Sequence, residues 1–512
     1  MNGAQALLRT LVDSGVDVCF GNPGTSEMHF VAALDDVPSM RAVLALFEGA
    51  VTGAADGYGR MAGKPAATLL HLGPGLGNGL ANLHNARRAR TPLLNVVGDH
   101  ATYHKRYDAP LESDIDAVAG SVSGWLRRSE SVELVAGDAA DGVAAALAGQ
   151  VATLVLPADV SWSDGATPVS PRPVPVPETV GDDVVRAVAG VLGENTILLL
   201  GGAALGQAGQ AAAARLGVRM FAETFPARMR RGAGLPAVER LGYLAEHVQH
   251  QLTGARHIVL AGARSPVSFF AYPGKASDLV PAGCEVHTLA APGQDVVGAL
   301  ENLADLVGGT APAVQAPARP AVPTGELTVQ NWADVIGALL PENAIVADEA
   351  NTSGVLLPAA TAGAPAHDVL TLTGGAIGQG LPLAAGAAVA CPDRPVVCVE
   401  ADGSAMYTLS ALWTQAREGL NVTTVVLSNR AYAILRMELQ RVGAVVDTAA
   451  GGDKAAELLD LSRPDLDFVS MAAGMGVPAS RATTGDELAA QFEKALAEPG
   501  PHLIEAVVPA LM

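Results

Sequence analysis

The strongest constraint on the fold is a regular alternation between short apolar segments and longer segments rich in alanine. Buried strands that alternate with helices indicate parallel sheets covered by helices on both faces. The apolar segments predict strands at residues 16–20, 43–46, 67–70, 93–97, 153–156, 196–200, 257–260, 345–347, 395–400 and 423–427. The alternation therefore predicts an α/β protein with doubly wound parallel sheets.

Two proline-rich stretches divide the chain of 512 residues into three parts of similar size. Prolines at this density keep a segment extended, so residues 166–179 and 309–325 are predicted to be stiff linkers. Each remaining part is long enough to have its own hydrophobic core. We therefore expect an N-terminal domain at 1–165, a central domain at 180–308 and a C-terminal domain at 326–512.

Composition narrows the class of protein. The net charge of −20 argues against nucleic acid or an anionic membrane as a partner. No apolar run approaches the roughly 20 residues that a membrane-spanning helix needs. The four cysteines form no C-x-x-C pair, which is typical of a reducing compartment, and residues 1–14 do not resemble a signal peptide. These features predict a cytoplasmic location.

A possible metal site follows two neighbouring strands near the C-terminal end. Asp402 comes directly after the predicted strand at 395–400, and Asn429 follows the next strand, with a predicted helix at 410–419 between them. Parallel neighbours present such residues to the same crevice, and Mg²⁺ prefers oxygen ligands from protein and phosphate. The alternative is an ordinary Asp-Gly turn, which also occurs at residues 56–57 and 164–165.

Glu48 opens a predicted helix directly after the strand at 43–46. An acid at this position is commonly only a favourable partner for the helix dipole. Its surroundings are apolar, however, and a carboxylate there is poorly hydrated unless it meets a specific partner. The glycine-rich loop at 73–79 does not complete a dinucleotide-binding fingerprint, because Leu80 stands where the third glycine belongs.

In combination, these segments resemble the thiamine-diphosphate enzymes, in the branch that contains acetolactate synthase large subunits and benzoylformate decarboxylase. The resemblance covers the whole chain in order. It rests on residues 21–27 (Gly-Asn-Pro-Gly-Thr-Ser-Glu), Glu48, the helix at 53–60, the loop at 73–75, and Asp402-Gly403-Ser404 with Asn429. It implies that the three α/β domains are a pyrimidine-binding domain, a central domain and a diphosphate-binding domain.

The resemblance also implies roles for individual residues. Glu48 would hydrogen-bond the aminopyrimidine ring of thiamine diphosphate and assist its proton transfers. Ile377 would hold the cofactor in a bent conformation, and the Gly375 carbonyl would accept from its amino group. Asp402, Asn429 and the Ala431 carbonyl would ligate Mg²⁺. Further cofactor contacts are expected at Asn78, Asn351, Thr352, Gly403, Ser404 and Tyr432. His71 and Thr25 are expected near the substrate.

The implied reaction is decarboxylation of a 2-oxo acid, followed by protonation to an aldehyde or by carboligation, as in acetolactate formation. Two departures from the family pattern, Ala401 and Ser428, flank the predicted metal ligands, and the stretch 268–273 lacks a histidine used by benzoylformate decarboxylase. The central part has no compelling FAD signature, although acetolactate synthases typically bind FAD. A homodimer or homotetramer with active sites at the subunit interface is expected.

Two alternatives stay open at this point. The first is a related lyase or carboligase that acts on another acyl substrate. The second is a catalytically silent subunit that regulates a true acetolactate synthase.

Overall fold

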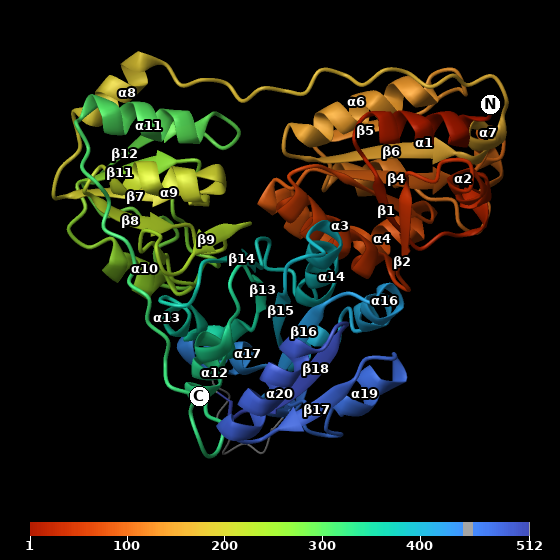
Figure 1. Ribbon diagram of the computed structural model, residues 1–512. Coiled ribbons are helices and arrows are strands. Elements are labelled where there is room, and N and C mark those ends of the chain that lie inside the picture. The colour runs from red at the N-terminus through yellow and green to blue at the C-terminus, as the bar shows by residue number, and fades with distance from the viewer. Residues whose placement is uncertain (444–453, 511–512) are drawn as a thin grey trace.

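The computed structural model describes residues 1–443 and 454–510 and confirms the predicted α/β class. Three sheets, with mostly parallel strands, form three lobes around a central junction (Figure 1). In this view an extended segment runs across the top from the first lobe to the second, and another descends to the third. Residues 166–180 and 309–324, which include most of both predicted linkers, contain no helix or strand. No helix of the described residues is long and apolar enough to cross a bilayer.

The first sheet has six parallel strands in the order β2-β1-β3-β4-β6-β5. Its strands are β1 (Val18–Gly21), β2 (Arg41–Leu44), β3 (Ala66–Leu70), β4 (Leu93–Asp99), β5 (Trp125–Arg128) and β6 (Val151–Pro157). Its helices are α1 (Gly3–Asp13), α2 (Met28–Leu34), α3 (Glu48–Ala62), α4 (Leu72–Ala89), α5 (Ile115–Gly120), α6 (Val135–Leu147) and α7 (Ala158–Trp162), with short 3₁₀ turns η1 (Thr25–Glu27) and η2 (Lys105–Tyr107).

The second sheet has five parallel strands in the order β10-β8-β7-β11-β12. Its strands are β7 (Thr196–Leu200), β8 (Arg219–Ala222), β10 (Glu239–Arg240), β11 (His257–Ala261) and β12 (Glu285–Ala290). The accompanying helices are α8 (Asp182–Ala189), η3 (Gly202–Leu205), α9 (Gln207–Ala214), α10 (Ala245–Gln251) and α11 (Val296–Leu306).

The third sheet has seven strands in the order β17-β18-β16-β15-β13-β14-β9. Its strands are β9 (Met229–Arg231), β13 (Ile345–Glu349), β14 (His367–Thr371), β15 (Val396–Ala401), β16 (Val422–Ser428), β17 (Ala479–Ala482) and β18 (His502–Val507). Its helices are α12 (Asn331–Leu339), η4 (Asn351–Gly354), α13 (Leu357–Ala360), α14 (Gly380–Ala390), α15 (Asp402–Ala405), α16 (Ala411–Glu418), α17 (Ala433–Arg441), α18 (Lys454–Leu458), α19 (Phe468–Gly474) and α20 (Gly485–Ala497). The edge strand β9 comes from the middle of the chain and pairs antiparallel with β14.

The first and third lobes share a core through the contact of α3 with α14 (Figure 1). The two helices approach so closely that a Cβ atom at Gly57 would collide with the Leu383 carbonyl, and one at Gly386 with the Ala54 carbonyl. Glycine is therefore needed at both positions for this backbone approach. The contact brings the start of α3 near the loop that precedes α14.

In the first and the third sheet, the strand order reverses next to the parallel strand that comes first in the sequence, which is β1 in the first sheet and β13 in the third. The order β2-β1-β3-β4 in the first matches β14-β13-β15-β16 in the third. Ligands of open α/β sheets bind at the carboxyl ends of the strands where the order reverses. The loops after β1 and β3, and those after β13 and β15, are thus the places where a site is expected.

Candidate functional site

Glu48 is the first residue of α3 and is only 6% exposed. Asn78 on α4 donates a hydrogen bond from Nδ2 to Oε2 of Glu48 at 3.0 Å. The other oxygen, Oε1, accepts no hydrogen bond from any described residue, and a Cβ atom at Gly75 would lie 3.1 Å from it. The structure thus holds a buried carboxylate by one oxygen and leaves the other available, which fits a ligand that carries a hydrogen-bonding ring nitrogen.

The predicted Mg²⁺ ligands lie where β15 and β16 end side by side, as expected from the sequence. The backbone amide of Arg430 donates to Asp402 Oδ2 at 2.6 Å, and that of Ala431 donates to Asn429 Oδ1 at 3.0 Å. Burial raises the pKa of Asp402 to about 6, although backbone amides lower it in part. One carboxylate, one amide oxygen and the Ala431 carbonyl make a set of hard oxygen donors that suits Mg²⁺.

The other residues predicted at this end also gather around the same strand ends. Asn351 and Thr352 belong to η4, directly after β13, and Asn429 Nδ2 donates to the neighbouring Ser353 hydroxyl at 3.2 Å. Tyr432 packs so closely on Gly403 that a Cβ atom there would meet its ring. The Ser404 hydroxyl points to the Glu400 carboxyl and donates to it. The structure therefore brings these candidates together, and their contacts with a cofactor stay a prediction.

Gly375 and Ile377 lie in the loop between β14 and α14, and Gly375 has a φ of +75°. Asn82 on α4 joins this loop to the start of α3, because its Nδ2 donates to the carbonyls of Gly49 at 2.8 Å and Gly378 at 3.2 Å. No hydrogen bond among the described residues joins Glu48 itself to Gly375 or Ile377. The Phe269 ring covers Gly375, with Cζ 2.6 Å from the place of a Cβ atom.

A buried acid beside His71 has no assigned role in the sequence predictions. Glu27 is 2% exposed, and its Oε2 lies 2.8 Å from His71 Nδ1. The Gly24 amide donates to the same oxygen at 2.8 Å, and the Ser26 hydroxyl donates to Oε1 at 2.6 Å. Thr25 is exposed next to this cluster. Glu27 is the last residue of the stretch 21–27, which follows β1. An acid at this position, just after a predicted strand, was the sequence signal that could have identified it as functional.

A second unpredicted feature is a pair of buried carboxyl groups in the third sheet, close to the strand end that carries the predicted Mg²⁺ ligand Asp402. Glu349 and Glu400 face each other at the ends of β13 and β15. The amides of Gly378 and Gly380 donate to Glu349, the former at 2.8 Å, whereas Glu400 Oε2 has no partner among the described residues. Burial raises the pKa of Glu349 to about 7, and burial with the charge of Glu349 raises the pKa of Glu400 further. Of the two groups, Glu349 therefore loses its proton first as pH rises, and Glu400 stays protonated to higher pH.

This pair predicts a pH-dependent stability. A carboxyl group whose pKa is higher in the folded than in the unfolded state binds more protons when folded, so stability falls as pH rises. The loss begins near the ordinary pKa of 4.5 and continues through about 7. Glu400→Gln should make the cofactor-free protein more stable at pH 8 by on the order of 1–2 kcal/mol and little different at pH 5. Urea unfolding at both pH values checks this, and an equal effect at both would contradict it.

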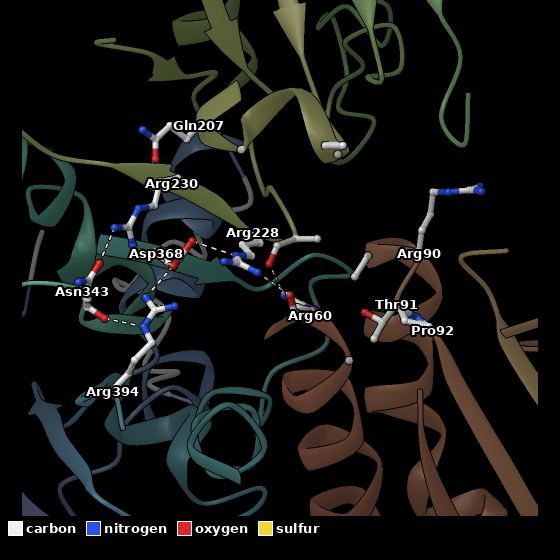
Figure 2. A pocket seen from close by; sticks show the side chains of 16 residues that line it. Arg60, Arg90, Thr91, Pro92, Gln207, Arg228, Arg230, Asn343, Asp368 and Arg394 are labelled. Carbon is white, nitrogen blue, oxygen red and sulfur yellow. Dashed lines mark hydrogen bonds and ion pairs between the residues drawn. The ribbon is translucent and has the colours of Figure 1, made fainter. Parts of the chain in front are cut away.

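A cavity of about 700 Å³ lies where the three lobes meet, and none of the predicted cofactor residues lines it. Figure 2 shows that arginine side chains dominate its wall and that several converge on Asp368. Arg228 Nε, Arg230 and Arg394 donate to this carboxylate at 2.9, 3.1 and 2.6 Å. Arg230 lies on β9 and Arg228 directly precedes this strand, so the cluster helps to hold β9 against β14.

Comparison with known proteins finds matches along the whole length of the chain. Residues 1–119 match the family model described as "Thiamine pyrophosphate enzyme, N-terminal TPP binding domain", and residues 350–506 match the corresponding "C-terminal TPP binding domain". The chain is 65% identical to a Mycobacterium tuberculosis protein named "Putative acetolactate synthase large subunit IlvX", over 100% of both chains. It is 31% identical to a benzoylformate decarboxylase of Pseudomonas aeruginosa, over 96% of both.

A solved structure shows the same likeness. The thiamine diphosphate-dependent 4-hydroxybenzoylformate decarboxylase of Rhodococcus jostii RHA1 superposes with a TM-score of 0.86 at 25% identity, covering 99% of both chains. The fold, the two matched domains and these full-length relatives lead to one conclusion. The chain belongs to the thiamine pyrophosphate enzymes, in the group with proteins named acetolactate synthase large subunit and benzoylformate decarboxylase.

Proposed function

We propose that this chain is a thiamine-diphosphate- and Mg²⁺-dependent enzyme that decarboxylates a 2-oxo acid. The observation that carries the proposal is the buried Glu48 carboxylate, held by Asn78 through one oxygen and open at the other. A buried carboxylate without a charged partner is costly, so its presence indicates a specific ligand. Thiamine diphosphate, when bound, supplies the electron sink for loss of CO₂.

The chain's own residues would bind and orient that cofactor. Glu48 would share a proton with the aminopyrimidine, while Asp402, Asn429 and the Ala431 carbonyl would hold Mg²⁺ against the diphosphate. The backbone amides that donate to Asp402 and Asn429 orient their oxygens. Removal of Mg²⁺ with a chelator should therefore release the cofactor and abolish turnover, and both should return when Mg²⁺ is restored.

The fate of the decarboxylated substrate depends on the proton donors near it. The buried Glu27 and the partly exposed His71 form an acid–imidazole pair that could deliver a proton, which supports aldehyde formation. The 65% identical relative carries the name of an acetolactate synthase, which supports carboligation. Incubation with the cofactors and pyruvate, 2-oxobutyrate or benzoylformate, followed by NMR of the products, distinguishes the two. Loss of CO₂ from none of them would argue against this substrate class.

His71→Ala should lower the rate of aldehyde release by about 100-fold, because general acid–base catalysis contributes a factor of this order. If the pair acts together, Glu27→Gln should have a similar effect, since Glu27 holds the imidazole by Nδ1. Decarboxylation followed with an artificial electron acceptor should change much less, because it does not need the proton. A variant of the exposed His250, which lies at the end of α10, is the matched control. Equal loss in both assays would contradict a role in protonation.

We also propose that the active form is a homo-oligomer. Large side chains in or next to the segments that carry the predicted cofactor residues are exposed in the single chain, including Val355 at 63%, Tyr407 at 55% and Leu435 at 46%. Exposed side chains of this kind beside a predicted site support a protein interface there. Analytical ultracentrifugation and activity, both measured on dilution, would test whether turnover is lost as the oligomer dissociates.

An absorbance spectrum of the purified protein would show whether FAD binds.

A further inference from the structure

Two histidines and a glutamate gather on the second sheet, which carries none of the residues predicted to bind the cofactor. His257 begins β11, and Glu285 and His287 lie on the neighbouring edge strand β12. His257 stands directly opposite Glu285 in the strand register, and Glu285 and His287 are two residues apart. Side chains two apart point to the same face of a strand, so the backbone of two paired strands directs all three to one spot.

The atoms that face each other have the spacing of metal ligands. His257 Nδ1 lies 3.1 Å from His287 Nε2, and Glu285 Oε2 lies 3.8 Å and 3.7 Å from these two nitrogens. A point equally distant from all three atoms is about 2.1 Å from each, which matches the distances from Zn²⁺ to imidazole nitrogen and carboxylate oxygen. The two carboxylate distances are too long for hydrogen bonds, whereas the two ring nitrogens are at hydrogen-bond distance from each other. An ion would therefore take the place of the hydrogen bond between the rings.

The geometry points to a binding site for a divalent transition-metal ion of the Zn²⁺ class at His257, Glu285 and His287. Two imidazoles and one carboxylate suit such ions, whereas Mg²⁺ and Ca²⁺ prefer sites made of oxygen alone. Glu285 is 71% exposed and both histidines are partly exposed, so an ion has access from solvent and water can complete its coordination. A bound ion would fasten the edge strand β12 to β11.

The affinity is expected to be moderate. Metal-bound histidines usually donate their second ring nitrogen to a carboxylate or carbonyl, and loss of such a partner weakens binding by 10- to 100-fold. Among the described residues, neither His257 Nε2 nor His287 Nδ1 has a hydrogen-bond partner. The site should therefore bind in the micromolar range, and the exposed Glu285 should contribute less than either imidazole.

The test uses the full chain saturated with Mg²⁺ and thiamine diphosphate, so that Asp402 and Asn429 are occupied. Wild-type protein should take up one equivalent of Zn²⁺ in equilibrium dialysis. Titration with Co²⁺ should give the visible absorption of a four-coordinate ion, and Zn²⁺ should raise Tm. His287→Ala should bind at least 10-fold more weakly and lose the rise in Tm. The control His250→Ala should behave as wild type.

Circular dichroism establishes that each variant is folded. Glu285→Ala is the second variant, because this exposed side chain can be removed with little risk to the fold, and it should also weaken Zn²⁺ binding. Uptake of Zn²⁺ that is unchanged in both His287→Ala and Glu285→Ala would overturn the proposal, as would the absence of a Zn²⁺ equivalent in wild-type protein.

Discussion

Glu48→Gln is expected to lower kcat by about 1,000-fold, while the affinity for thiamine diphosphate changes by less than about 10-fold. The substitution keeps the size of the side chain and an oxygen that can accept from Asn78 Nδ2, so the start of α3 should be undisturbed. It removes the carboxylate that can share a proton, which an amide cannot do. Most of the binding energy should lie at the opposite end of the cofactor, with Mg²⁺ and the diphosphate.

The measurements are steady-state turnover on the best 2-oxo acid and calorimetric titration with thiamine diphosphate at saturating Mg²⁺. Glu194→Gln is the matched control, because this glutamate is exposed and has no hydrogen-bond or ion-pair partner among the described residues. It should leave both quantities unchanged. Full activity in Glu48→Gln would remove the basis of the proposed mechanism. Failure of wild-type protein to bind the cofactor would instead favour the silent regulatory subunit.

The strands and helices that carry the site could be predicted from local pattern. The predicted strand at 395–400 is β15, the helix at 410–419 is α16 and the strand at 423–427 is β16, each within two residues. The two apolar runs are short and rich in β-branched residues, so their length and composition indicated strands. The convergence of Asp402 and Asn429 then followed from parallel pairing alone.

Contacts between distant segments could not be predicted in this way. Glu349 and Glu400 are 51 residues apart in the sequence, yet the pairing of β13 with β15 places them opposite each other. Strand β9 is three residues long and joins a sheet whose other strands begin more than 100 residues later. Tertiary packing decides both the pairing of the two buried acids and the position of β9 at the edge of the sheet. Neither can therefore be predicted from a local sequence pattern.

Asp368→Asn is expected to lower the free energy of unfolding by about 3 kcal/mol, the largest effect on stability that we predict. Asp368 is 1% exposed and is the shared acceptor of Arg228, Arg230 and Arg394. Without its charge, three guanidinium groups would face one another with no counter-charge. The expected loss lies at the low end of the range for breaking a buried ion pair, because the side chains of the three arginines are 18–41% exposed and water can partly screen their charges.

Urea unfolding of the cofactor-free protein measures this loss, and Asp305→Asn is the control. Asp305 is 70% exposed and pairs only with Arg215 among the described residues, so its substitution should cost less than about 1 kcal/mol.

Burial alone would raise the pKa of Asp368, but the hydrogen bond from Arg228 and the neighbouring arginines hold this pKa below 3.8. Its contribution is therefore present above about pH 4 and is lost as pH falls through the lower folded-state value. The difference between wild type and Asp368→Asn should shrink in strong acid, and a difference that grows there would show that the lost interaction is not the ionised cluster.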